Sequence, residues 1–397
     1  MDFWSNPVKA AGEWLAGVFA GWGMNANAAA VLTAFIGILL LITVVMVLDI
    51  FLVWLERKIV ARFQDRLGPN RLGPFGLIQP FADIIKLIIK ENIYPVGVDK
   101  IVYNLAPVLM MMSVLLLWAV LPLTSFLGMD LNVGVLYLIG VGALGTLSII
   151  MAGWSSNNKY ALLGSFRQVA VMISYEIPMV VALLIPTILS GTMGINSIVQ
   201  AQSTWYIVIA PLAFLVFLIS ALAELGRAPF DLTEAESELI AGHHIEYSGM
   251  KFGLFYAAEL LHAFTFGGFI AAFFFGGWRG PWADQVPALG LLWFLLKSTV
   301  IYWVFGWVKY TMPRIRIDKM LALNWKFLVP FSLALMMFLA VMNALLRGTS
   351  FYVLGMFLSN VAFGWATLEI LRRRARGERE KAEGKGHGVT APAVHGD

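Results

Sequence analysis

Nine apolar segments, each about as long as a bilayer is thick, dominate this 397-residue chain. They lie at residues 30–54, 104–126, 134–153, 169–190, 205–223, 252–276, 289–308, 327–346 and 351–371. A membrane-spanning helix needs about 20 apolar residues, and only helices and closed barrels satisfy all their backbone hydrogen bonds in lipid. The sequence therefore predicts an all-α, polytopic integral membrane bundle of eight transmembrane helices, or nine if 351–371 also spans.

The apolar segments follow one another without a polar interval long enough for a second folded domain. We therefore predict one helical membrane domain over 1–371, with a short amphipathic segment at its amino end. Residues 372–397 carry seven of the 28 Lys and Arg residues and form a charged tail. Because such a composition buries little apolar surface, we expect this tail to be partly disordered.

Basic residues gather in alternate loops between the apolar segments. The regions 57–100, 154–167, 224–251 and 309–326, together with the tail, hold 24 of the 28 Lys and Arg residues. Loops with an excess of Lys and Arg stay in the cytoplasm. The pattern predicts that the amino terminus lies outside the cell and the carboxyl terminus lies in the cytoplasm.

The chain contains no Cys and five His residues. It therefore lacks the thiolates that usually hold iron–sulfur clusters, and its histidines suggest no inward-facing ligand set for haem or zinc. We expect no metal site here and assign no catalytic residue to this chain alone. If the chain takes part in redox chemistry, we expect it to do so without a metal of its own, and nothing in the sequence indicates nucleic-acid binding.

The first basic loop contains an amphipathic pattern. Gln79, Asp83, Lys86 and Lys90 recur at spacings of four, three and four residues, and apolar residues fill the opposite face. This spacing predicts a helix that lies on the membrane surface, too short and too polar to span it. By pattern alone, such a helix could serve only as an anchor.

Residues 220–259 hold seven of the 24 acidic residues, between two apolar segments. These are Glu224, Asp231, Glu234, Glu236, Glu238, Glu246 and Glu259. Carboxylates this close together disfavour joint ionisation, so the pKa values of some are raised, which is the property that proton carriers need. A solvated acidic loop is the ordinary alternative, but the mixed apolar and charged turn at 227–231 favours buried structure.

Two further charged residues fall within apolar segments. Glu176 lies two residues before Pro178, where the helix loses a backbone hydrogen bond. Lys297 lies well inside the segment 289–308 and needs a partner, for which Glu259 or Glu224 is the natural candidate. Ionisable residues at membrane depth usually mark functional sites.

Four motifs, at residues 56–91, 153–176, 227–252 and 314–330, together resemble the H-subunit family of bacterial NADH–quinone oxidoreductases, the respiratory complex I. The resemblance covers about residues 30–346. It implies a membrane subunit of a proton-translocating respiratory-chain enzyme in the bacterial inner membrane, with quinone as its substrate. Other membrane-arm subunits and the hydrophilic subunits of the quinone module are the implied partners. The latter would carry FMN and the iron–sulfur clusters.

The same resemblance implies roles for individual residues. Those that line or support a quinone chamber and its entrance are Arg57, Arg62, Arg66, Asp83 and Arg227. Those that form an acidic proton path are Glu176, Glu224, Asp231, Glu234, Glu236, Glu238, Glu246 and Glu259, with Lys297 coupled to it. The chain departs from the family at Gly226, His243, His244 and His262. His243 and His244 would add groups that titrate near neutral pH.

Three alternatives remain open on the sequence alone. The same type of chain also occurs in ferredoxin-, deazaflavin- or hydrogenase-linked complexes, and the electron donor is a property of other chains. An ion-coupled secondary transporter would use its carboxylates to bind an ion, although no repeat typical of that class is visible. A purely structural anchor for a soluble redox arm is the third.

Overall fold

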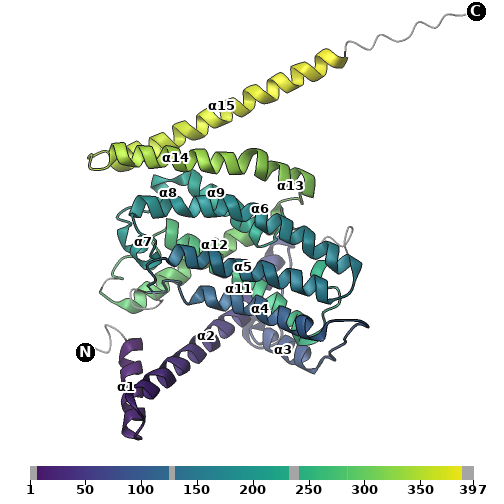
Figure 1. The fold of residues 1–397 in the computed structure, drawn as a ribbon, viewed down its shortest axis with the longest axis vertical. Helices are drawn as coiled ribbons and strands as arrows, with labels where there is room; N and C mark the ends of the chain where they lie inside the picture. Colours follow the sequence, from purple (N-terminus) through teal and green to yellow (C-terminus); the bar gives the residue numbers. More distant parts are fainter. Residues whose placement is uncertain (1–6, 125–129, 232–240, 284, 387–397) are drawn as a thin grey trace, which may run out of the picture.

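The computed structural model describes residues 7–124, 130–231, 241–283 and 285–386. Within these ranges the regular structure is entirely helical, which confirms the predicted all-α class. Eight of the described helices are long and apolar enough to cross a membrane (Figure 1). The eighth, Tyr352–Gly377, corresponds to the predicted segment at 351–371.

The helices, in chain order, are α1 (Pro7–Gly21), α2 (Ala26–Phe63), α3 (Gln79–Ile89), α4 (Lys100–Trp118), α5 (Gly134–Ser155), α6 (Lys159–Ser190), α7 (Ile195–Ala201), α8 (Tyr206–Ile209), α9 (Pro211–Glu224), α11 (Gly249–Phe274), α12 (Pro287–Thr311), α13 (Ile317–Leu323), α14 (Val329–Leu346) and α15 (Tyr352–Gly386). Three short turns, η1 (Pro74–Gly76), η2 (Gly242–His244) and the π-helical η3 (Asn324–Leu328), join some of them.

The bundle is built around α11, which packs on α4 on one side and on α12 on another. In its most apolar 18-residue window, 89% of the residues are buried. Two glycines allow this close packing. A Cβ atom at Gly267 would lie 2.9 Å from the Ser298 carbonyl oxygen of α12, and one at Gly268 would lie 3.0 Å from the Phe294 ring. Small residues at helix crossings are typical of membrane bundles.

Starting from α4, further helices pack in a row. Helices α4, α5, α6 and α14 lie side by side, with α9 also packed on α6, and α15 packs on α14 before it diverges from the bundle (Figure 1).

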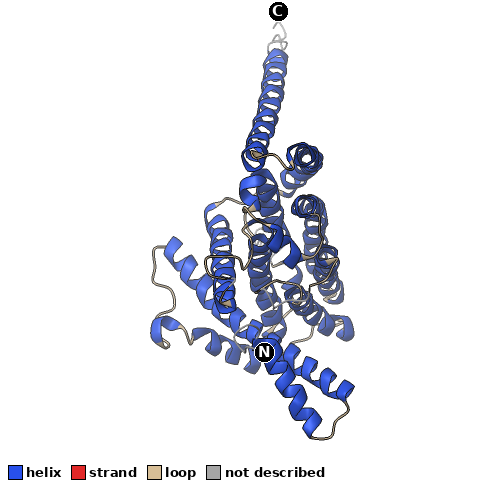
Figure 2. Cartoon of the chain, turned by 90° about the vertical axis from the view of Figure 1, so that its left-hand side faces the viewer, coloured by secondary structure: helices blue, strands red, loops and turns tan. Residues whose placement is uncertain are grey.

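At the opposite edge, α1 and the first half of α2 form a hairpin that projects from the body (Figures 1 and 2). Only 6% of the most apolar window of α2 is buried. These two projecting elements offer their apolar surfaces to lipid or to partner subunits.

The predicted helix at 205–223 consists of two pieces. The helix α8 ends at Ile209, and Ala210 leaves the helical region with φ −137° and ψ 62°. The cause is Pro211, which has no N–H to donate and disfavours a helical conformation in the residue before it. The remaining α9 has 14 residues, which is shorter than a full span needs.

The predicted amphipathic helix forms as α3, which packs against α2 and α11. Its apolar residues Phe81, Ile85 and Ile88 are exposed on the outer surface of the protein. The helix α2 runs to Phe63, nine residues beyond its predicted end at residue 54. At 38 residues, α2 is about 57 Å long, so it reaches beyond a hydrocarbon layer of about 30 Å.

Candidate functional site

A buried carboxylate, Glu56, gathers four polar partners near the carboxyl end of α2. It accepts hydrogen bonds from the hydroxyl groups of Tyr302, at 3.1 Å, and Tyr310, at 2.8 Å. Lys309 Nζ donates a third at 3.2 Å, and Arg227 Nη2 lies 3.5 Å away. An ionised carboxylate has about four lone-pair directions. Because Glu56 is only 6% exposed, these partners replace the water that burial removes.

Arg227 joins this cluster to a second carboxylate. It is 1% exposed, and its Nε lies 4.0 Å from Glu259 Oε1 of α11. Its guanidinium carbon lies 5.6 Å from the centre of the Tyr302 ring, within cation–π range. Burial alone would lower the pKa of Arg227, but the Glu56 carboxylate raises it above its ordinary value. One fixed positive charge therefore lies between a carboxylate of α2 and a carboxylate of α11.

A groove of about 340 Å³ lies between α2, α3 and α11. Its walls are mostly apolar, with Ile50 and Val53 from α2 and Leu254 and Ala257 from α11. Arg57 and Asp83 also line it, and their side chains form an ion pair of 2.6 Å between α2 and α3. This combination suits a small amphiphilic molecule with a polar head and an apolar tail.

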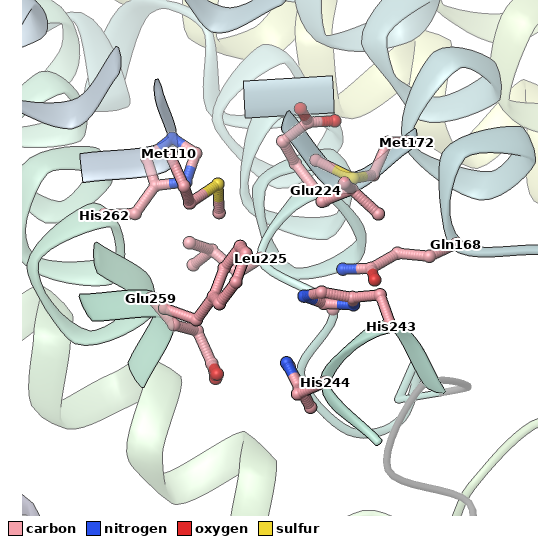
Figure 3. Close-up of a pocket in the computed structure, with 12 residues that line it drawn as sticks. Met110, Gln168, Met172, Glu224, Leu225, His243, His244, Glu259 and His262 are labelled. Carbon is pink, nitrogen blue, oxygen red and sulfur yellow. The ribbon is translucent and has the colours of Figure 1, made fainter. Parts of the chain in front are cut away.

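A narrow internal cavity lies between α6, α9 and α11, with Glu259 among the residues that line it (Figure 3). Figure 3 shows Glu259 and His262 of α11 on one side of it, facing Gln168 of α6 and His243 of η2 on the other. Glu224, at the end of α9, also lines it. With about 30 Å³ of accessible volume, the cavity has room for about two water molecules.

Several polar atoms around the cavity are unpaired among the described residues. They are Gln168 Oε1, Glu224 Oε2, His243 Nδ1 and His244 Nδ1, all buried. Buried polar groups without a protein partner are normally satisfied by internal water. The arrangement therefore favours a small hydrated site that connects two carboxylates, Glu224 and Glu259.

The two adjacent histidines of this cavity do not titrate near neutral pH. Burial lowers the pKa of His244 to about 4. Burial, together with the neighbouring His244, holds the pKa of His243 well below its ordinary value. The expectation from the sequence that these histidines add groups titrating near pH 7 is therefore wrong for this pair, because burial disfavours the charged form of each ring.

Lys297 lies away from both carboxylates that were predicted to pair with it. Its Nζ donates to three backbone carbonyl oxygens, those of Phe275 at 2.8 Å, Gly277 at 2.9 Å and Arg279 at 2.7 Å. These carbonyls follow the last turn of α11, where the helix leaves acceptors unpaired. The predicted ion pair with Glu259 or Glu224 is wrong, because backbone groups already satisfy this ammonium.

The remaining predicted residues are dispersed. Glu176 of α6 is half-buried and lies within electrostatic range of Glu224. Glu246 accepts a hydrogen bond from Asn158 Nδ2 at 2.7 Å, and Asp231 pairs with Arg314 at 3.5 Å. Arg62 and Arg66 are exposed at and beyond the end of α2. Glu234, Glu236 and Glu238 lie outside the described residues.

The sequence analysis did not identify Glu56, the carboxylate at the centre of the cluster, as a site residue. Glu56 is the first residue of the basic loop motif and lies beyond the predicted end of its helix at residue 54. A second missed residue, Asp49, lies seven positions earlier, and both belong to the buried face of α2. The spacing of seven between two acidic residues near the end of an apolar segment was the available signal, since it places both on one helix face. Among the described residues, no group of three or more His, Asp or Glu side chains could hold a metal ion.

Comparison with known proteins gives a consistent result. A model of the NADH dehydrogenase family matches residues 36–340. The H subunit of the NADH-quinone oxidoreductase of Dehalococcoides mccartyi is 48% identical over 291 residues, covering 73% of this chain and 81% of the relative. The first of the numbered H subunits of Geobacter metallireducens is 44% identical over 322 residues, with coverage of 78% and 94%. The H subunit of Brevibacillus brevis is 43% identical over 317 residues, with coverage of 79% and 94%.

Proposed function

The chain belongs to the NADH dehydrogenase family and is a membrane subunit of NADH–quinone oxidoreductase, and on this premise we propose that it both guides quinone and couples quinone reduction to proton movement. The observation that carries this proposal is the position of Arg227. The side chain lies between Glu56, whose neighbour in the chain, Arg57, lines the groove, and Glu259, which lines the internal cavity. A charge change on one side of Arg227 therefore acts on the other side.

The groove between α2, α3 and α11 is the proposed route for quinone from the lipid. A quinone carries a polar ring on an apolar tail, which matches apolar walls with an Arg57–Asp83 ion pair at one end. Exposed Arg62 and Arg66 extend this basic surface beyond α2. Reduction of the ring by two electrons requires two protons, and the charge of the reduced ring before protonation is favoured near these cations.

The cavity and its carboxylates are the proposed beginning of the proton path. Glu224 and Glu259 line the cavity, and Glu176 lies within electrostatic range of Glu224. Internal water can relay protons between carboxylates that have no direct contact. When charge develops on quinone, the Glu56–Arg227–Glu259 cluster shifts the affinity of these carboxylates for protons. Asp231, Glu246 and the acidic residues 234, 236 and 238 would extend the same path.

We further propose the cellular context. The protein would reside in the bacterial inner membrane, with its amino terminus outside and its carboxyl terminus in the cytoplasm, as the distribution of Lys and Arg indicates. Its partners would be the other membrane-arm subunits and the hydrophilic subunits of the quinone module, which supply electrons through FMN and iron–sulfur clusters. The protein does no chemistry on its own, since it supplies binding, charge and proton transfer to the assembled enzyme.

The test uses membranes in which the complex carries Glu56→Gln. We expect NADH–quinone reduction to fall at least about tenfold and NADH-driven proton translocation to fall with it. Reduction of an artificial acceptor at the NADH end should persist, which shows that the complex assembles. The matched control is Glu369→Gln, which removes a partly exposed carboxylate that pairs with Arg373 on α15. Normal quinone kinetics and normal pumping in the assembled Glu56→Gln complex would contradict the proposal.

The same membranes separate the rival functions. A related complex with another donor predicts that reduced ferredoxin or a reduced deazaflavin drives quinone reduction where NADH does not. A secondary transporter predicts ion-coupled uptake by the purified chain without any electron donor. A structural anchor predicts that Glu56→Gln reduces assembly while the activity per assembled complex stays normal.

A further inference from the structure

Asp49 is a buried acidic residue that the proposed function does not use. It lies on the inward face of α2, in a stripe that continues through Leu52 and Glu56. The residue is 4% exposed, and its Oδ1 has no hydrogen-bond partner among the described residues. A carboxyl group at membrane depth is costly unless a partner satisfies it. The buried Oδ1 atom without a hydrogen-bond partner therefore suggests that Asp49 binds a ligand.

Asp49 also lines the groove between α2, α3 and α11. Arg57 and Asp83 form the polar group at one end, and Asp49 lies eight residues before Arg57, roughly 12 Å along the helix axis. Between them α2 presents Ile50 and Val53. The α2 wall of the groove thus carries two polar groups with apolar residues between them, Arg57 near the loop and Asp49 further from it, and Met46 continues the wall beyond Asp49.

The other ionisable groups nearby do not satisfy Asp49. Arg57 is paired with Asp83, and Lys86 of α3 lies 3.6 Å from the same Asp83 carboxylate. Glu56 lies two turns further along α2 and carries the same sign of charge. Tyr256 of α11 lines the groove as well, but no hydrogen bond joins it to Asp49 within the described part of the chain. An occupant of the groove is left as the natural partner.

We propose that Asp49 binds the ring of a quinone or quinol inside the groove, as a polar station that the ring meets before it reaches the Arg57–Asp83 end. This inference rests on the proposed function, since it assumes that quinone uses the groove. A protonated carboxyl donates to a quinone carbonyl oxygen, and a carboxylate accepts from a quinol hydroxyl. The apolar tail of the ligand then lies along Ile50 and Val53 towards the lipid. Binding alone is involved, and no proton or electron changes place at Asp49.

The experiment measures the kinetics of NADH–quinone reduction in membranes, with decylubiquinone and with a short-chain menaquinone analogue. Asp49→Leu keeps the size of the side chain and removes its hydrogen bonds. We expect KM to rise about threefold to tenfold, the value of one lost hydrogen bond, with kcat changed less than about twofold. Asp49→Asn keeps a donor and an acceptor, so its KM should remain much closer to that of the wild type. Glu369→Gln again serves as the control for loss of a carboxylate elsewhere.

A second variant separates this inference from the function on which it rests. Ala257→Phe adds a ring to the α11 wall of the groove and should slow quinone reduction if quinone passes there. If Ala257→Phe is slow and Asp49→Leu has a normal KM, the Asp49 station is wrong and the groove route stands. If both variants behave as wild type, the groove route fails as well. If Asn and Leu at position 49 raise KM equally, hydrogen bonding is not the role of Asp49.

Labelling of the wild-type complex tests the same point without any variant. An azido-quinone bound to the intact complex and activated by light should label the α2 peptide that contains Asp49, and an excess of decylubiquinone should prevent it. Labelling confined to other segments would overturn the proposal. This measurement also decides the case if Asp49→Leu does not assemble.

Discussion

Arg227 Nη2 lies 3.5 Å from Glu56 Oε2, and both residues are almost completely buried. Burying two charges is costly, and removing one member of such a pair leaves the other charge unpaired, at a cost of about 3–5 kcal/mol. Arg57, next to Glu56 in the chain, lines the groove, and Glu259, 4.0 Å from Arg227, lines the internal cavity. The integrity of the Glu56–Arg227 pair is therefore the first property that mutation should test.

Arg227→Ala should sharply reduce the amount of assembled complex and lower quinone reduction in what remains. Arg227→Lys keeps the charge but cannot spread it between two carboxylates, so we expect an intermediate defect. Arg373→Ala is the control, because it removes an arginine from an exposed ion pair on α15, where the loss is worth less than about 1 kcal/mol. Unchanged quinone kinetics in an assembled Arg227→Ala complex would count against a role in the quinone path.

Glu224→Gln should interrupt the proposed proton path without changing the shape of the cavity. The amide is nearly isosteric and can still hydrogen bond, but it cannot carry a proton. We expect quinone reduction and proton translocation to fall together in membranes that contain the assembled complex. If assembly and both activities stay normal, Glu224 is not on the path.

Lys297→Met should lower stability rather than coupling. The ammonium donates to three carbonyl oxygens after α11, and hydrogen bonds to a charged group contribute about 1.5–3 kcal/mol each. We expect the complex to dissociate at a lower temperature, while the number of protons moved per electron stays the same. A changed ratio of protons to electrons would instead place Lys297 on the proton path.

The buried histidines predict that the fold loses stability in acid. The pKa of His244 is about 4 in the folded chain, against about 6.5 when unfolded, so the unfolded state binds more protons between these values. Stability should therefore fall as the pH drops from about 6.5 to about 4, by on the order of 3 kcal/mol for this residue. Thermal unfolding between pH 7.5 and 4.5 should show a weaker pH dependence in His244→Gln than in the wild type. Equal slopes in both proteins would contradict the burial argument.

The fold could be predicted further from the sequence than the site could. Apolar length located the spanning helices, and the spacing of Gln79, Asp83 and Lys86 located α3. The break at Pro211 could have been anticipated, because proline restricts the residue before it. Hydropathy gives the depth of a residue but not its neighbours across the bundle, so it could not show that Glu56 meets Tyr302, Lys309 and Tyr310 of α12.

The partners of Lys297 illustrate the same limit more sharply. A lysine in an apolar segment suggests an acidic partner, but the Lys297 ammonium donates hydrogen bonds to backbone carbonyl oxygens just after α11. Side chains can be counted in a sequence, whereas unpaired carbonyls depend on where a helix stops and what packs beside it. Of the described members of the acidic stretch, only Glu224 and Glu259 line the cavity.

The Glu56 cluster also constrains how the chain is made. Glu56 emerges early during synthesis, whereas three of its partners, Tyr302, Lys309 and Tyr310, belong to α12. Roughly 250 residues separate Glu56 from Tyr310, a delay on the order of 10–50 s at typical rates of translation. Until then the carboxylate has to stay with water or with the insertion machinery. Folding of this protein is thus completed late in synthesis, when α12 brings Tyr302, Lys309 and Tyr310 to α2.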